Sequence, residues 1–175
     1  GKLVVFYCFV IFVMLFAIKI SEKAVSTLSE NTILERGNCI IIDPGHGGED
    51  GGAVAPTGLP ESTYNLEISL KLNDLLNLLG FRTKMIRTTD TAIYTNGDSL
   101  SQKKASDLKE RVRIINETEG AVLLSIHQNH FSQSKYSGAQ VFYSKNFSSE
   151  SSGLAESIQE SIVYFTQPQN KRQIK

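Results

Sequence analysis

The stretch that decides the fold is residues 39–48, which read CIIIDPGHGG. Three consecutive isoleucines form a short, continuous β-branched run, and such a run indicates a strand that is buried on both faces, as in a parallel sheet. The proline and glycines that follow favour a loop directly after the strand. The sequence therefore predicts a buried strand whose carboxyl end opens into a glycine-rich loop containing His46.

Strand-like and helix-like patterns alternate along the rest of the chain. Strand-like runs occupy 81–87, 121–126 and 138–144, and apolar residues at helical spacing occupy 61–79, 101–118 and 154–165. Gly80 is expected to end the first of these helices. The alternation predicts an α/β fold with a mostly parallel sheet and helices on both faces.

The N-terminal segment is apolar and uncharged from Leu3 to Ile18, LVVFYCFVIFVMLFAI, between Lys2 and Lys19. A membrane span needs roughly 20 apolar residues and a signal-peptide core about 7–15, so the segment fits either a signal peptide or an anchor. A buried core helix is less favoured, because the run is apolar on every side. We expect residues 1–20 to be a signal or membrane helix, 21–38 a linker, and 39–175 an exported domain.

Composition and motif spacing exclude several function classes. Lys and Arg number 18 and so do Asp and Glu, so the net charge is zero and gives no basic surface for nucleic acid. The glycine-rich loop lacks both the GxGxxG spacing and the Lys-Ser/Thr ending of nucleotide-binding loops. Cys8 falls in the apolar segment and Cys39 in the first strand, so neither a disulfide nor a cysteine metal site is expected.

Three residues of metal-binding type are expected at one edge of the sheet. His46 and His127 each lie just past the end of a strand, and parallel strands end at a common edge where ligands bind. Glu61 begins the first helix, which should start at the same edge. Taken singly, each histidine could be an ordinary polar side chain, and Glu61 a charge that favours a helix start. Together they form a catalytic zinc set that suits amide hydrolysis, although without the HExxH spacing of other zinc proteases.

Two further residues are candidates for orienting these histidines. A zinc-bound imidazole usually donates its second N–H to a carboxylate or a carbonyl. Asp43 lies three residues before His46, and Asn129 two residues after His127. The alternative for Asp43 is that it only caps the Pro-Gly turn.

Five ordered sequence blocks resemble the zinc-dependent N-acetylmuramoyl-L-alanine amidases. The blocks are Ile42–Gly48, Gly58–Glu61 with Asn65-Leu66, Arg87–Asp90, Leu108 with Arg111 and Asn116, and Ser125–Asn129. Members of this family cleave the amide between the lactyl group of muramic acid and the first L-alanine of the peptidoglycan stem peptide.

The resemblance implies a set of roles for this chain. It implies that His46, Glu61 and His127 bind Zn²⁺, and that Asn129 lies beside the site. It also implies that two residues of the blocks, Arg87 and Arg111, mainly brace the fold. Peptidoglycan is the implied substrate, and an activating protein partner is possible. One anchor-like segment with one catalytic domain resembles the family members that prepare the spore cortex.

One expected residue has no counterpart in the sequence. Family members carry a second glutamate, the general base, on or after a late strand. Glu150, Glu156 and Glu160 come too early to match, so the general base is expected beyond Lys175 and the catalytic residue within the chain is unknown. Two alternatives follow: a zinc-binding but inactive wall-binding protein, and a secreted zinc peptidase of another type, which fits the three donors but not the five blocks.

Overall fold

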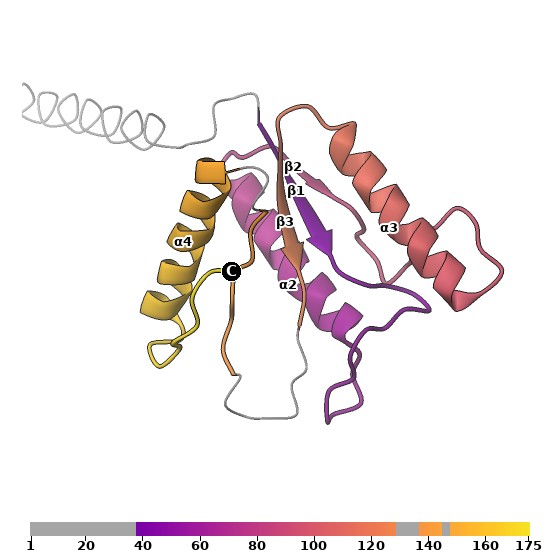
Figure 1. Ribbon diagram of the computed structural model, residues 1–175, viewed down its shortest axis with the longest axis horizontal. Coiled ribbons are helices and arrows are strands. Elements are labelled where there is room, and N and C mark those ends of the chain that lie inside the picture. The colour runs from indigo at the N-terminus through magenta and orange to yellow at the C-terminus, as the bar shows by residue number, and fades with distance from the viewer. Residues whose placement is uncertain (1–37, 129–136, 145–147) are drawn as a thin grey trace, which may run out of the picture. The chain divides into compact units, whose positions relative to one another are not determined.

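The structure, a computed structural model, describes residues 38–128, 137–144 and 148–175 (Figure 1). The chain divides into two compact units, of which the first ends at Gln128 and the second runs from Asn129 to Lys175. Within the described ranges no helix has the length and apolar character that crossing a membrane requires. The predicted N-terminal helix, and nearly all of the linker after it, lie outside them.

The first unit is built on a three-stranded parallel sheet. Its elements in chain order are β1 (Cys39–Pro44), α2 (Glu61–Leu78), β2 (Thr83–Met85), α3 (Leu100–Asn116) and β3 (Ala121–Ile126). The strand order is β2-β1-β3, and both pairings are parallel. Every residue of the central strand is buried, as its continuous apolar sequence predicts. The α/β fold with a parallel sheet is therefore confirmed.

The two helices of this unit belong to crossovers that run in opposite directions across the sheet. The first leads from β1 to β2 through α2, and the second leads from β2 past β1 to β3 through α3. Since such crossovers are right-handed, helices on connections of opposite direction cover opposite faces. The burial of β1 on both sides agrees with this arrangement, which the sequence predicts.

Helix α2 forms where the sequence predicts it, but its buried face is not the leucine stripe. The helix begins at Glu61, and Gly80 follows its end in the left-handed conformation with φ 86°. Small polar residues make up the buried face, namely Ser62, Asn65 and Ser69. The exposed apolar residues are Ile68, Leu75, Leu78 and Leu79. The helix therefore contacts the chain after β1 through polar groups, and Asn65 donates directly to Gly45 O at 3.1 Å.

One strand that the sequence predicts in the second unit is not observed. Residues 138–144 are described and are not a strand. Their backbone bonds instead to the C-terminal residue: Tyr143 N–H donates to Lys175 O, and Lys175 N–H donates to Val141 O. The Val141 N–H also donates to the side chain of Gln159 on α4 (Ser148–Phe165). The segment is extended, but a side chain supplies part of the bonding that a strand would supply in a sheet.

Helix α3 begins with a capping box that offers a stability test. The Ser99 hydroxyl accepts the N–H of Gln102 at 3.3 Å, and the Gln102 side chain accepts the N–H of Ser99 at 3.2 Å. We expect Ser99→Ala to lower the free energy of unfolding by about 1 kcal/mol, because helix-end N–H groups lose their partner. Urea denaturation would measure the change. Ser101→Ala, at an exposed position in the first turn, is the control, and equal losses in both variants would contradict the capping role.

Candidate metal centre

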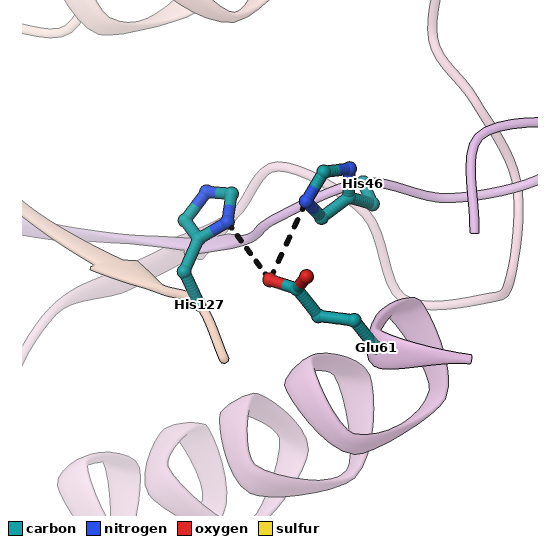
Figure 2. Close-up of side chains that lie close together, drawn as sticks. All are labelled: His46, Glu61 and His127. Atoms are coloured by element: carbon teal, nitrogen blue, oxygen red, sulfur yellow. Dashed lines mark hydrogen bonds and ion pairs between the residues drawn. The ribbon is translucent and has the colours of Figure 1, made fainter. Parts of the chain in front are cut away.

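Three side chains from three elements meet at the carboxyl edge of the sheet (Figure 2). His46 follows β1, His127 follows β3, and Glu61 is the first residue of α2. Each of them offers one ligand atom, and these atoms all lie within 4.8 Å of one another. The structure thus brings together the residues that the sequence places at a common edge.

The distances between these donors suit a single metal ion. Glu61 Oε1 lies 3.4 Å from His46 Nε2 and 3.2 Å from His127 Nδ1. The two imidazole rings are T-shaped to each other with centroids 5.0 Å apart. Donors bound tetrahedrally at zinc distances would be roughly 3.3–3.6 Å apart. Two imidazoles and one carboxylate at this spacing form a donor set that fits zinc without large rearrangement.

The Glu61 carboxylate is buried and held from several sides. Its Oε1 accepts the Gln128 N–H at 2.8 Å and an Asn65 side-chain N–H at 3.3 Å, and its Oε2 accepts the Ala53 N–H at 3.1 Å. Burial raises the pKa of Glu61, but the bonds from Ala53, Gln128 and Asn65 outweigh it, so the pKa lies below its usual value. The carboxylate is ionised at neutral pH, as a metal ligand must be.

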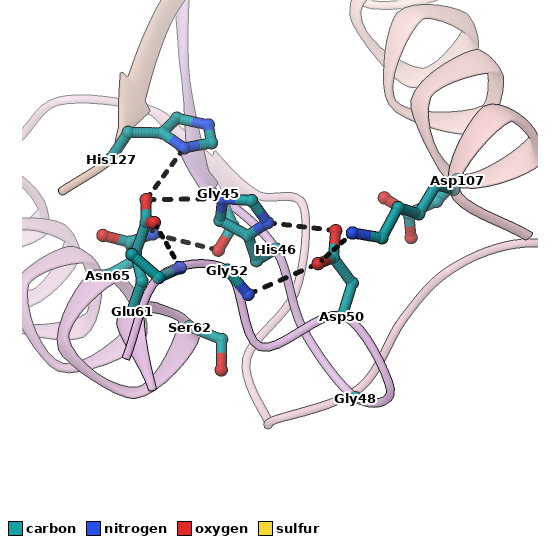
Figure 3. A network of polar contacts seen from close by, with 12 residues as sticks. Gly45, His46, Gly48, Asp50, Gly52, Glu61, Ser62, Asn65, Asp107 and His127 are labelled. Atoms are coloured by element: carbon teal, nitrogen blue, oxygen red, sulfur yellow. Dashed lines mark hydrogen bonds and ion pairs between the residues drawn. The ribbon is translucent and has the colours of Figure 1, made fainter. Parts of the chain in front are cut away.

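Asp50 orients the imidazole of His46 (Figure 3). Its Oδ2 lies 3.0 Å from His46 Nδ1, while Lys104 Nζ contacts its Oδ1 at 2.8 Å and the Gly52 N–H donates to Oδ1 at 3.3 Å. Burial raises the pKa of Asp50, but the bonds from Lys104 and His46 lower it to about 2. An ionised Asp50 can only accept a hydrogen bond, so it holds the Nδ1 side of the ring, and Nε2 is the ring nitrogen that faces Glu61.

The carboxylate partner of His46 is Asp50 and not the predicted Asp43. Asp43 binds Arg111 through Oδ1 and accepts the Ser125 hydroxyl through Oδ2 at 2.9 Å, and Asp50 occupies the role expected of it. Asp43 also does not merely cap the Pro-Gly turn. It is a residue of β1, in register with Ser125 of β3, so its direction is set by the pleat of the sheet. The other candidate, Asn129, lies outside the described residues.

A signal for Asp50 is present in the sequence but is easy to miss. It is an acidic residue four positions after a candidate ligand, inside a loop of glycines. The loop folds back on itself through paired backbone bonds between Gly47 and Asp50, at 2.8 and 3.2 Å. Spacing in the sequence does not show this reversal, and it is the reversal that brings the carboxylate to His46.

Close approach at the centre requires glycine at position 52. A Cβ atom there would lie 2.7 Å from Glu61 Oε2 and 2.7 Å from His46 Cδ2. The residue also has φ 70°, which L side chains rarely adopt. The loop can therefore contact both donors only because Gly52 has no side chain.

Comparison with known proteins places the chain among cell-wall amidases. The family described as N-acetylmuramoyl-L-alanine amidase matches residues 40–175. The germination-specific N-acetylmuramoyl-L-alanine amidase of Bacillus subtilis is 39% identical over 127 residues, 72% of this chain and 53% of that protein. The amidase LytC of the same organism is 33% identical over 145 residues, 82% of this chain and 26% of that protein. The chain spans about half the length of these relatives or less.

Solved structures agree with the sequence relatives. The CwlD amidase of Clostridioides difficile, solved in complex with the GerS lipoprotein, superposes with a TM-score of 0.73 at 37% identity, covering 79% of this chain and 71% of that one. An N-acetylmuramoyl-L-alanine amidase of Clostridium difficile 630 gives a TM-score of 0.66 at 28% identity, covering 81% and 70%. Fold and sequence therefore point to the same family.

Proposed function

Because the chain belongs to the N-acetylmuramoyl-L-alanine amidase family, we propose that it hydrolyses the amide between N-acetylmuramic acid and L-alanine in peptidoglycan, with zinc held by His46, Glu61 and His127. The observation that carries this proposal is the convergence of the three donors within 4.8 Å of one another. Zinc bound by this set supplies a Lewis acid that polarises a carbonyl and activates water near neutral pH.

The residues around the centre prepare it for that role. Glu61 is ionised and fixed by three donors, so its position does not depend on the metal. Asp50 holds His46 in the tautomer that presents Nε2. The His127 side chain is 46% exposed, so the centre is accessible from solvent on that side.

We extend the proposal to where the protein acts and with what. The uncharged run within residues 1–20 supports export, with the domain 39–175 working outside the cytoplasm on cell wall or spore cortex. The similarity to a germination-specific amidase supports a role in sporulation or germination. The C. difficile relative was solved with a lipoprotein bound, which supports an activating protein partner for this chain as well.

The products of digestion test the proposed reaction. Purified peptidoglycan treated with the chain should gain free L-alanine amino groups without gaining reducing sugar ends. A chelator should stop the release and added zinc should restore it. New reducing ends would indicate a glycosidase, and new amino groups on other stem residues a peptidase. Zinc binding without any product would favour the inactive wall-binding alternative.

Asp50→Ala should weaken zinc binding without removing it. Loss of a carboxylate that orients a metal-bound histidine typically lowers metal affinity about 10–100-fold. Competition with a chromogenic chelator would measure the affinity. Glu49→Ala is a matched control, because this neighbouring acid pairs with Lys103 at 2.9 Å and not with His46. Equal affinities in the two variants would show that Asp50 does not orient His46.

A further inference from the structure

Two buried arginines bind three successive carbonyl oxygens of the loop that carries His46. Arg87 donates from Nε to Pro44 O at 2.9 Å and from Nη2 to Gly45 O at 3.0 Å. Arg111 donates from Nη1 to Pro44 O at 3.1 Å and from Nη2 to His46 O at 2.9 Å. We call Arg87 and Arg111 the arginine clamp. The arginine clamp fixes the backbone of Pro44, Gly45 and His46. Arginines that only joined a helix to the sheet would not need to bind these three carbonyl groups.

Arg87 also connects the backbones beside two of the metal donors. The Nη2 atom that binds Gly45 O donates to Ser62 O at 2.9 Å as well. Gly45 precedes His46, and Ser62 follows Glu61. A single nitrogen thus joins the two chain segments from which these donors project. Asn65 of α2 donates to the same Gly45 O at 3.1 Å, so Arg87 and Asn65 together tie the start of α2 to the chain before His46.

Arg111 acts on a strained residue. His46 has φ 61°, and it is the non-glycine residue with positive φ in the described part of the chain. Such a conformation persists where the surroundings fix it, and it is found often at functional sites. Arg111 Nη2 binds the carbonyl of this same residue. The His46 ring faces Glu61 with Nε2 3.4 Å from Oε1, and Arg111 holds the backbone from which this ring projects.

The Arg87 half of the clamp is electrostatically costly, which argues against a purely structural role, whereas the burial of Arg111 is outweighed by its bonds to Asp107 and Asp43, which raise its pKa. Arg87 and Arg111 are only 4% and 6% exposed. Burial lowers the pKa of Arg87, and the nearby charge of Arg111 lowers it further. Asp43 and Asp107 bind Arg111 and balance its charge. Apolar residues often replace buried charges without loss of stability. Two guanidinium groups at this position are therefore better explained by the geometry that they impose on the loop.

We propose that Arg87 and Arg111 are positioning residues. They preset the distance between the His46 and Glu61 donors and the direction of each donor. Through this geometry they set the affinity for zinc, separately from any contribution that they make to folding. The inference rests on the proposed function, because it takes those donors as zinc ligands. Lysine keeps the charge but cannot form the planar fork that binds several carbonyls at once. Arg87→Lys and Arg111→Lys are therefore the informative variants.

The test compares zinc affinity with the stability of the metal-free chain. Each variant of the full 175-residue chain is titrated with zinc against a chelator, below its own melting midpoint. We expect each lysine variant to bind zinc about 10–100-fold more weakly, and its cobalt form to show an altered visible spectrum. Ile41→Val, at a fully buried position in β1, is the control that lowers stability without touching the loop. Arg113→Lys, on the exposed side of α3, controls for the substitution itself.

The outcomes separate this inference from the proposed function. Weakened zinc binding in the clamp variants, with normal affinity in Ile41→Val and Arg113→Lys, supports the inference. Unchanged affinity in folded clamp variants overturns it and leaves the proposed function standing. A wild-type chain that binds no zinc overturns both. If Arg111→Lys does not fold, Asp107→Asn serves as a milder variant, because it weakens only the partner of Arg111 Nε. We expect this variant to bind zinc severalfold more weakly. Wild-type zinc affinity in Asp107→Asn would count against the clamp.

Discussion

Replacing His127 with alanine should reduce bound zinc from about one ion per chain to a small fraction of that, because catalytic zinc is held by three protein ligands. His46 and Glu61 would remain, each fixed by its own hydrogen bonds, but two donors hold the metal poorly. Hydrolysis of muramoyl-alanine should fall with the metal by about 10³-fold or more, since the metal supplies several kcal/mol to such reactions. Metal analysis after gel filtration, and amine release from peptidoglycan, measure the two effects.

His130→Ala is the matched control for this prediction. It removes a histidine three positions further along the chain, which lies just outside the last of the five sequence blocks. Zinc content and amine release should stay near wild type. The His127 side chain is half exposed, so the metal-free stability of His127→Ala should also change little. A His127→Ala chain that kept a full zinc complement would remove the assignment of all three ligands.

The sequence predicts the fold of the first unit because its signals are local. Continuous apolar strands and 3.6-residue spacing are set by neighbouring residues, and β1, α2, α3 and β3 form where these patterns lie. Local pattern cannot show which way a helix faces. The leucine stripe of α2 predicts the helix correctly, yet the buried face carries Ser62, Asn65 and Ser69, because the helix must approach backbone groups beside the metal centre. The strand-like pattern of residues 138–144 also predicts a strand that is not observed, because the backbone of this segment bonds to Lys175 and to the Gln159 side chain of α4 instead of to a neighbouring strand.

The sequence predicts the part of the site that follows from sheet topology. Parallel strands end at one edge, and that alone brings His46 and His127 together. The orienting contacts depend on details that spacing does not encode. Asp50 reaches His46 only because the loop reverses at Gly47, and Asp43 turns away because its place in β1 directs it toward Arg111 and Ser125. The general base, Asn129 and the N-terminal helix remain predictions.

Gly45→Ala should abolish tight zinc binding while leaving the fold nearly intact. A Cβ atom at position 45 would lie 2.2 Å from His127 Cε1 and 2.3 Å from its Nε2, far inside contact distance. The backbone cannot yield, because Gly45 N–H donates to Ile126 O at 2.9 Å and Gly45 O accepts bonds from Arg87 and Asn65. The imidazole is half exposed and can rotate away. We therefore expect the substitution to move the His127 imidazole and to leave the backbone at position 45 in place.

We expect the zinc affinity of Gly45→Ala to fall by at least about 100-fold, as for a lost ligand, and hydrolysis to fall with it. The melting temperature of the metal-free chain should stay within a few degrees of wild type, because neither β1 nor its hydrogen bonds change. Gly153→Ala is the control, since nothing lies within 4 Å of a Cβ atom at that position on α4. A Gly45→Ala chain that unfolded would mean that the backbone had moved instead of the ring. Zinc affinity equal to wild type would place His127 outside the metal centre.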